Sequence, residues 1–231
     1  MKEKKSDYAN FPICLLAESD IKRVVKNALD YACYWHSKSL NIGTDKYSDS
    51  MKYFMFSKIN PEMVLESKTN GQRMYELYNH SNHVGVKVST LWNYFFEEKS
   101  SDDIINLRAY CATKSIIGNE KFKKTNKEQI VSKMFGVEKT SQIVDGANLK
   151  YLKRYQYVKL ISELEKHWYL KYVSNHSRGC FISYKLSLVD LMFEEERSKL
   201  YSKIGTVNSA KQTVRMQAKK KLRDYLNKAE N

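Results

Sequence analysis

Proline and glycine are scarce in this chain, which has only two prolines and eight glycines among 231 residues. Sandwiches and barrels depend on many tight turns and are richer in these residues, so long helices are favoured here instead. Hydrophobic residues make up 42% of the chain and aromatic residues 13%, which is enough for a packed core. We therefore predict a folded, mainly α protein of one large or two small domains.

The segment Thr125–Gly136 has the chemistry of a short helix followed by a turn. The Thr125 hydroxyl can accept from the Glu128 amide, and the Glu128 carboxylate can accept from the Thr125 amide, which would form a capping box. Apolar residues recur inside the segment at helical spacing, and Gly136 stands where the chain must turn. These apolar residues are Ile130, Val131, Met134 and Phe135. The segment therefore predicts a helix with a defined start and end.

Two elements are predicted upstream of this short helix. Asp102–Ile117 has the apolar content of a helix, with Ser101 or Asp102 as its possible cap and Gly118 just past its end. Between the two helices, Lys121–Lys124 has room for a short strand. The order so far is helix, strand and capped helix.

A long helix and a hairpin are predicted downstream. Apolar residues at mostly three-residue steps indicate a helix from Asn148 to about His167. They are Leu149, Leu152, Tyr155, Val158, Ile161 and Leu164. Trp168–Val173 and Cys180–Leu186 then alternate as strands do, and Asn175–Gly179 has the turn chemistry of a hairpin.

This order of elements resembles the winged helix-turn-helix family of DNA-binding domains, found in bacterial transcription regulators and in replication initiators of plasmids and phages. The resemblance covers about residues 101–186. In that family the third helix lies in the major groove and the hairpin, or wing, contacts the neighbouring backbone or minor groove. In the ordinary motif the recognition helix begins about three residues after the turn glycine. This chain departs from that pattern, because the segment Val137–Ala147 follows Gly136 before the predicted long helix. The recognition helix is therefore either a short piece, Glu138–Val144, or a helix that begins near Asn148.

The net charge of +14 is concentrated in the same part of the chain. Residues 102–186 contain 16 lysines and arginines against 8 acidic residues, whereas residues 1–101 contain 14 against 12 and residues 187–231 contain 10 against 6. A local basic excess is typical of a surface that binds phosphates, because each neutralised phosphate releases counterions. The alternative is a lysine-rich surface that is simply solvated.

The resemblance implies three groups of DNA-contacting residues. Those near the turn are Lys123, Lys124, Lys127, Lys139, Thr140, Ser141 and Gln142; those on the long helix are Lys150, Lys153 and Arg154; those at the wing tip are Asn175, His176 and Arg178. Arg154 and Gln142 have side chains that can pair bidentately with base edges, whereas the lysines are expected to neutralise phosphates. For any single lysine, a solvated surface position is the alternative.

Residues 1–100 are predicted to form a helical N-terminal lobe. Ser19 or Asp20 can cap a helix that runs to about Leu40. Further helices are expected at Ser48–Ile59, Pro61–Asn79 and Ser89–Glu98, and Val84–Val88 is either a strand or part of a loop. The pair Asn70-Gly71 could split the third of these helices. The lobe could dimerise, bind a small effector, or pack against the DNA-binding unit.

Residues 187–231 are predicted to form C-terminal helices with a basic amphipathic tail. Leu186–Ile204 places apolar residues on one side of a helix, and from Gly205 onward an apolar stripe is surrounded by lysines and arginines. Such a tail lies along DNA phosphates, extends a homodimer interface, or is a loose solvated terminus. The sequence leaves these three interpretations open.

The sequence gives little support to catalysis, cofactors or a membrane. It contains no glycine-rich phosphate loop, no His-Glu-x-x-His and no Gly-x-Ser-x-Gly. Two pairs, Cys33 with His36 and His80 with His83, have a spacing that zinc ligands use, but an apolar helix face and a polar loop explain them without metal. No apolar run approaches the roughly 18 residues of a membrane span. We expect a cytoplasmic protein without enzyme activity, cofactor or metal.

The resemblance and the charge together favour a non-catalytic, double-stranded DNA-binding protein, expected to be a transcription regulator of a bacterial or mobile-element locus. One alternative is a replication initiator of a plasmid or phage, although such initiators often carry two winged domains and residues 1–100 show few strand signals. Another alternative is a protein-interaction module that reuses the winged fold. That interpretation would gain if the N-terminal lobe covered the basic surface.

Overall fold

The computed structural model describes residues 7–40, 47–54, 56, 59–175, 179–201 and 216. Two compact units divide the chain, Met1–Lys185 and Leu186–Asn231, and each is described by itself. The fold is mainly helical with two small antiparallel sheets, as the scarcity of turn residues predicts. Within the first unit we refer to residues 7–100 as the N-terminal region and to residues 101–185 as the basic region.

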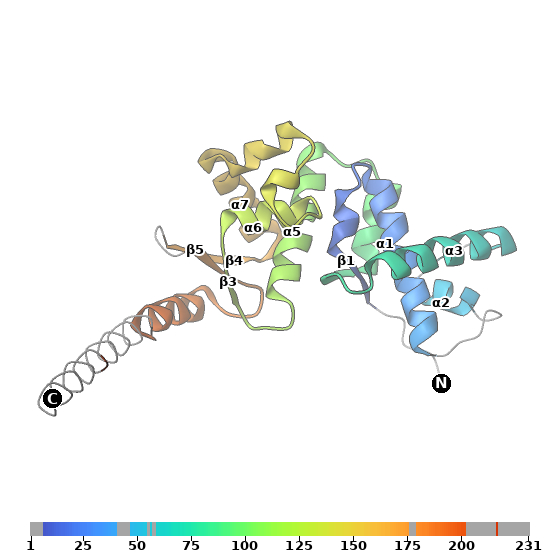
Figure 1. Cartoon of the computed structure of the whole chain (residues 1–231), viewed down its shortest axis with the longest axis horizontal. Coiled ribbons are helices and arrows are strands. Elements are labelled where there is room, and N and C mark those ends of the chain that lie inside the picture. Colours follow the sequence, from blue (N-terminus) through green and yellow to red (C-terminus); the bar gives the residue numbers. More distant parts are fainter. Residues whose placement is uncertain are drawn as a thin grey trace, which may run out of the picture. The chain divides into compact units, whose positions relative to one another are not determined.

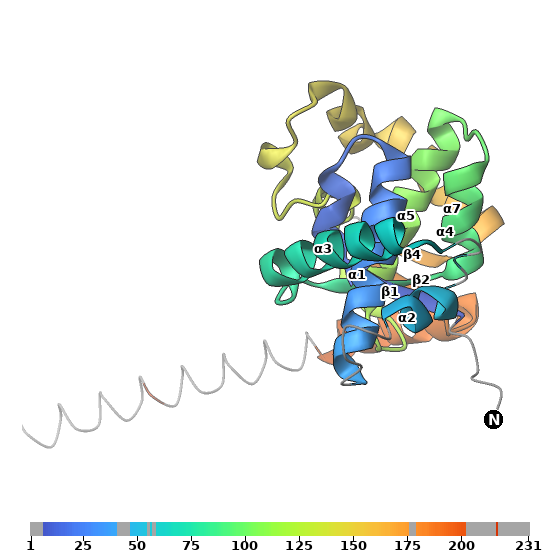
Figure 2. The ribbon, with the colours of Figure 1, turned by 90° about the vertical axis from the view of Figure 1, so that its right-hand side faces the viewer.

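The N-terminal region consists of helices around a two-stranded sheet (Figure 2). Its elements are β1 (Tyr8–Pro12), the 3-10 helix η1 (Ile13–Ala17), α1 (Ile21–Ser39), α2 (Tyr47–Tyr53), α3 (Pro61–Tyr78), β2 (His83–Lys87) and α4 (Val88–Phe96). Strands β1 and β2 pair antiparallel, with Tyr8 opposite Lys87. The sequence predicted β2 as one of two possibilities but did not predict β1, and α2 is shorter than the predicted helix.

Local capping explains where the two long helices begin. The Asp20 side chain accepts a hydrogen bond from the Lys22 amide at 2.9 Å, and the Asn60 side chain accepts one from the Met63 amide at 2.8 Å. Gly71 does not split α3; a Cβ there would lie 2.4 Å from the Asp30 carbonyl oxygen of α1. The glycine is therefore a point of close helix packing.

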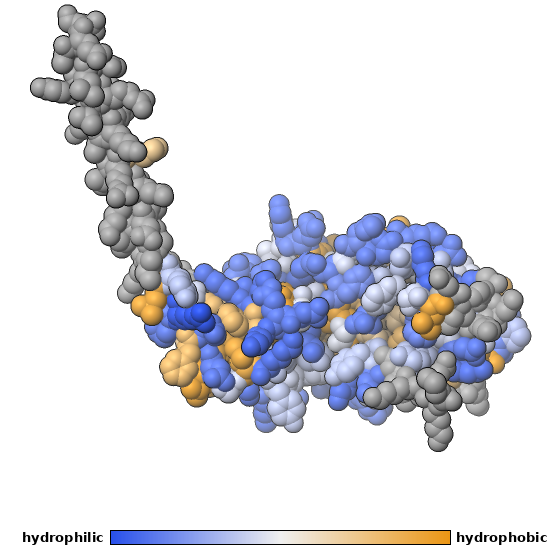
Figure 3. Space-filling model, turned by 90° about the horizontal axis from the view of Figure 1, so that it is seen from below, coloured by the Kyte–Doolittle hydropathy of each residue, from blue (hydrophilic) through white to orange (hydrophobic). Residues whose placement is uncertain are grey.

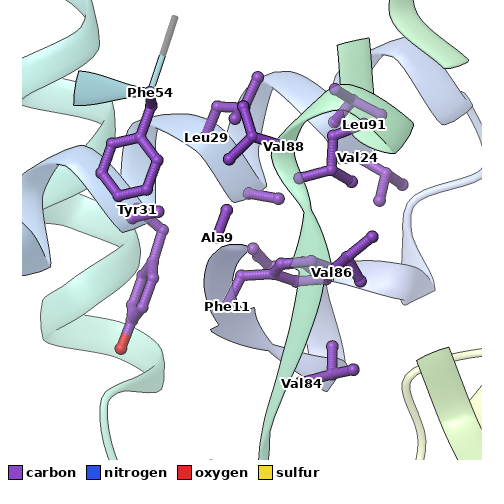
Figure 4. Packing of buried hydrophobic residues seen from close by; sticks show 14 of the residues in the cluster. Ala9, Phe11, Val24, Leu29, Tyr31, Phe54, Val84, Val86, Val88 and Leu91 are labelled. Atoms are coloured by element: carbon purple, nitrogen blue, oxygen red, sulfur yellow. The ribbon is translucent and has the colours of Figure 1, made fainter. Parts of the chain in front are cut away.

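Apolar side chains from strands and helices meet in the first hydrophobic cluster (Figure 4). Phe11 and Val86 point from the strands toward Val24 and Leu29 of α1, and Leu91 of α4 closes the group. Each of these five side chains is buried. Their burial fixes the two-stranded sheet against α1, because a register slip of one residue would turn the strand side chains away from the core.

The basic region adds helices and a three-stranded sheet (Figure 1). Its elements are α5 (Ser101–Ile117), β3 (Lys123–Thr125), α6 (Lys127–Met134), the 3-10 helices η3 (Thr140–Gln142) and η4 (Gly146–Leu152), α7 (Arg154–Trp168), β4 (Lys171–Asn175) and β5 (Gly179–Ser183). The sheet is antiparallel with strand order β3-β5-β4. The predicted hairpin is therefore present, with strands that are shorter than expected.

The helix caps differ by one residue from those predicted. Ser100 caps α5 in a capping box with Asp103, instead of Ser101 or Asp102. Asn126 caps α6, its side chain accepting from the Gln129 amide at 2.7 Å, so the predicted box between Thr125 and Glu128 is wrong. Thr125 is extended because it pairs with Cys180 at the end of β3.

The long helix begins later in the chain than the sequence predicts, and neither of the two predicted recognition helices is present as an α-helix. Residues Gly146–Leu152 form a 3-10 helix, and the α-helix starts only at Arg154, so a start near Asn148 is wrong. The other alternative, Glu138–Val144, contains only the one-turn 3-10 helix Thr140–Gln142. The recognition helix expected from the resemblance can therefore only correspond to α7.

Helix α5 connects the two regions of the first unit. Leu107 and Cys111 belong to the first hydrophobic cluster, whereas Ala109 and Ala112 belong to a second cluster formed by the basic region. Gly136, at the end of α6, has a φ of 67°, and a Cβ there would lie 2.7 Å from the Cys14 carbonyl oxygen. Close backbone approach thus joins the turn after α6 to η1.

The second unit contains one described helix, which covers residues 188–201. Large apolar side chains are exposed along it, and they include Leu188, Val189, Met192 and Phe193. These side chains form the hydrophobic surface of the unit visible in Figure 3. The basic tail predicted from Gly205 onward lies outside the described residues, apart from Met216.

Candidate nucleic-acid interface

Helix α7 has one buried face and one exposed face. Tyr157, Leu160 and Leu164 point into the second hydrophobic cluster and are buried. On the opposite side Tyr155 is 76% exposed and Val158 is 58% exposed, and Arg154 beside them is also exposed. Large side chains at such exposure contribute little to the core, so this face is available for contact with a partner.

This assignment of faces corrects the sequence interpretation. Tyr155 and Val158 belong with Leu164 to the apolar spacing that predicts this helix, but the structure exposes both of them and buries Tyr157 and Leu160. Two apolar stripes run along this helix in the sequence, and their spacing does not distinguish them. Tyr155 and Val158 are therefore candidate site residues that the sequence did not identify.

Packing holds α7 in a defined position. The Tyr157 ring lies edge-on to Tyr172 of β4, with ring centroids 6.4 Å apart. At the other end Tyr169 caps the helix in the left-handed conformation, with a φ of 59°. Helix and sheet are thus fixed relative to each other, which is what a rigid recognition surface requires.

Four of the predicted cations are exposed and have no hydrogen-bond, ion-pair or aromatic-ring partner among the described residues. They are Lys124, Lys139, Lys153 and Arg154. Lys150 is also exposed, and its Nζ lies 5.2 Å from the centroid of the Tyr151 ring. Unpaired cations add directly to the positive potential of the surface, because no nearby carboxylate cancels them.

Other predicted contact residues are engaged within the protein. The Lys127 ammonium donates to the Leu152 carbonyl oxygen at 2.6 Å, which attaches α6 to the last residue of η4, two residues before the start of α7. Lys123 pairs with Glu120. Lys127 is therefore better explained as a residue that positions α7 than as one that contacts DNA.

The residues of the turn have mixed roles. The Gln142 Oε1 atom accepts from the Glu138 amide at 3.0 Å and from the Lys139 amide at 2.9 Å. A bidentate contact of Gln142 with adenine would have to break these two bonds, so the geometry does not favour the predicted role. Ser141 beside it is exposed and Thr140 is half-buried.

The wing tip is only partly described. Asn175 is the last residue of β4 and lies opposite Gly179 of β5, so the two strands end at the predicted turn. The Asn175 side chain, His176 and Arg178 lie outside the described part of the structure. Their predicted DNA contacts therefore stay predictions.

The N-terminal region packs mainly on α5 and α6 of the basic region, and of α7 it contacts the C-terminal residue Trp168. Contacts from η1 and β2 fall on α5 and α6, whereas α7 packs on α5, η4 and β4 (Figure 1). Arg108 of α5 forms the polar part of this junction; it is buried and donates to the Leu16 carbonyl and to the Glu18 carbonyl at 2.6 Å. The cations around α7 therefore remain open to solvent.

Among the described residues, no group of three or more histidine, cysteine or acidic side chains is placed to hold a metal ion. None of the described helices is both long and apolar enough to cross a bilayer. Of the histidines in the candidate zinc pairs, His83 instead contacts the Tyr31 hydroxyl, with its Nε2 at 2.6 Å.

Comparison with protein-family models, with curated proteins and with solved structures finds no match to this chain.

Proposed function

We propose that residues 101–185 form a winged helix-turn-helix domain that binds double-stranded DNA with α7 as its recognition helix, and that the protein acts as a non-catalytic regulator. The element order α5, β3, α6, α7, β4, β5 supports this proposal, as does the pairing of β3 with the hairpin strand β5. In the resembling family such a helix enters the major groove and the hairpin contacts the backbone beside it.

The exposed face of α7 carries the proposal. Arg154 offers a planar fork of donors that fits a guanine edge, and Val158 and Tyr155 offer apolar surface that fits the methyl group of thymine. Lys153, immediately before the helix, is placed to neutralise a phosphate. A side chain set that combines base-reading and phosphate-binding groups on one rigid helix is typical of duplex recognition.

The exposure of these cations also bears on the protein-interaction alternative. That alternative would gain if the N-terminal region covered the basic surface, but Lys139, Lys153 and Arg154 are all exposed. Because these cations are not covered, they give no reason to prefer the protein-interaction alternative over a DNA-binding role.

The proposal is tested by selecting bound duplexes from a random pool and measuring affinity by fluorescence anisotropy. We expect Arg154→Ala to weaken binding by about tenfold or more, since a bidentate contact to a base contributes roughly 1–3 kcal/mol. The matched control is Arg23→Ala, which removes an exposed arginine from the first turn of α1. The proposal fails if no duplex is enriched, or if both variants bind as the wild type does.

A further inference from the structure

An apolar cavity of about 610 Å³ lies in the N-terminal region among α1, α2, α3 and α4. Its size falls within the range of small-molecule sites, roughly 300–1,000 Å³. One wall is aromatic: Trp92 stacks on Phe96 with ring centroids 5.2 Å apart and meets Phe56 edge-on at 5.0 Å. The Trp92 indole nitrogen donates to the Phe54 carbonyl at 3.0 Å, which holds the ring in place.

The facing wall is polar and carries more acid than base. The Lys26 ammonium from α1 lies 3.2 Å from the Asp30 carboxylate and 3.0 Å from the Glu66 carboxylate of α3. Two carboxylates against one ammonium leave this wall with a formal charge of −1. A cationic group would relieve this imbalance, whereas an anionic ligand would have to displace Glu66 from Lys26.

Asp30 of this wall is only 1% exposed, and hydrogen bonds hold its carboxylate in place. Its carboxylate accepts from the Ser67 hydroxyl at 2.7 Å and from the Asn70 amide at 2.8 Å, in addition to the Lys26 ammonium. A buried carboxylate is tolerated when hydrogen bonds and a counter-charge compensate the lost water. The acidic wall is therefore preformed.

The cavity opens to solvent at its rim. Glu66 is 67% exposed as a side chain and Phe96 is 70% exposed. The rim therefore contains an exposed aromatic ring and an exposed carboxylate, the same two kinds of group that line the interior. A ligand can therefore reach both walls without unfolding the helices.

We propose that this cavity binds a small molecule that carries an aromatic or bulky apolar body and a protonated amine. The apolar body stacks on Trp92 and Phe96, and the amine lies at the exposed carboxylate of Glu66, while the buried Asp30 carboxylate behind it holds Lys26. The faces of aromatic rings attract both cations and apolar groups, so the aromatic wall and the acidic wall both favour an amine with an apolar body. The proposal concerns the N-terminal region alone and does not depend on DNA binding by α7.

The test uses three probes of one shape and different charge: 1-naphthylmethylamine, 1-naphthalenemethanol and 1-naphthoate. Each is titrated into the full chain without DNA, and binding is followed by NMR of ¹³C-labelled methionine methyl groups. Met51 and Met63 line the cavity, whereas Met134 is buried in the second cluster and serves as an internal control. We expect the amine to shift the Met51 and Met63 resonances, to leave Met134 unchanged, and to bind more tightly than the alcohol or the naphthoate.

Two variants locate the site. Glu66→Gln is expected to weaken amine binding by about two- to fivefold, as for a partly exposed ion pair, and to leave binding of the alcohol unchanged. The matched control is Glu62→Gln on the first turn of α3, which does not line the cavity. Ser89→Trp places a large ring at an exposed lining position of α4 and should abolish binding of the amine and the alcohol.

The proposal is overturned if the amine leaves the Met51 and Met63 resonances unshifted at saturating concentration. It is equally overturned if the naphthoate binds as tightly as the amine, or if Ser89→Trp binds the amine unchanged. The Met134 resonance and the helical circular dichroism signal show whether each variant is folded. A loss of binding in a folded Ser89→Trp protein supports the cavity as the site.

Discussion

The two regions of the first unit treat their charged side chains differently. Residues 1–101 contain 14 basic against 12 acidic residues, and pairs such as Lys26 with Asp30 and Glu66, and Lys52 with Asp49, neutralise part of this charge locally. Residues 102–186 contain 16 basic against 8 acidic residues; Lys159 of α7 pairs with Asp102, but Lys139, Lys153 and Arg154 have no carboxylate partner among the described residues. Individual surface ion pairs contribute little to stability, so the contrast affects the electrostatic potential of the surface rather than the stability of the fold. A charge excess that is not neutralised locally is available to a charged partner.

Arg108 is a cation of the basic region whose partners lie in the N-terminal region. Arg108→Met removes the donor to the carbonyls of Leu16, Glu18 and Ser19. We expect a loss of about 3 kcal/mol in the free energy of unfolding, because the carbonyl of buried Leu16 is left unpaired and two further hydrogen bonds are lost. Urea denaturation measures it, with exposed Arg23→Met as the control. A loss of under about 1 kcal/mol would mean that the junction does not depend on this side chain.

Gly71 tests the packing of the N-terminal region itself. A Cβ at this position would lie 2.4 Å from the Asp30 carbonyl oxygen, so Gly71→Ala must move α3 away from α1. We expect destabilisation of about 1–3 kcal/mol by thermal or urea denaturation. Gly146→Ala is the matched control, since a Cβ there has no atom within 4 Å. Equal stability of the two variants would contradict the close approach of the helices.

Lys127 distinguishes a positioning cation from a contacting one. Lys127→Met removes the hydrogen bond to the Leu152 carbonyl, and we expect a loss of about 1–2 kcal/mol in stability. The salt dependence of duplex binding should stay unchanged, because no phosphate contact is lost. If the stability were unchanged and the salt dependence smaller, Lys127 would be a DNA contact, as the sequence predicted.

The smallest expected effect is a pH dependence that arises in the N-terminal region. Burial lowers the pKa of His83, whose Nε2 contacts the Tyr31 hydroxyl. The neutral ring is favoured in the folded state, so its contribution is present above the ordinary histidine pKa of about 6.5 and is lost as the pH falls below it. The melting temperature of His83→Asn should therefore fall less between pH 7 and 5 than that of the wild type. An identical fall in both proteins would exclude His83 as the cause.

Features set by neighbouring residues could be predicted from the sequence. The start of α1 follows from the cap Asp20, the start of α3 from Pro61 in its first turn, and the turn at Gly136 from its conformational freedom. The mainly helical fold follows from composition in the same way. These features depend on interactions within a few residues, which a single sequence displays.

Features set by distant contacts could not be predicted. Strand β1 exists because it pairs with β2, from which it is separated by three helices. The cap of α6 moved from Thr125 to Asn126 because Thr125 pairs with Cys180. The candidate site shows the same limit: packing against the sheet turned Tyr157 inward and Tyr155 outward, and it engaged Lys127 with a distant carbonyl.

The contrast between the two regions is tested most directly by the salt dependence of duplex binding in two variants of equal charge. One variant carries Lys139→Ala, Lys153→Ala and Arg154→Ala, and the other carries Lys22→Ala, Arg23→Ala and Lys52→Ala, all exposed positions. Each lost phosphate contact lowers the slope of log affinity against log salt by about 0.9. We predict a slope smaller by about two to three units for the first variant and an unchanged slope for the second. Equal slopes in the two variants would contradict the assignment of the DNA-binding surface to α7.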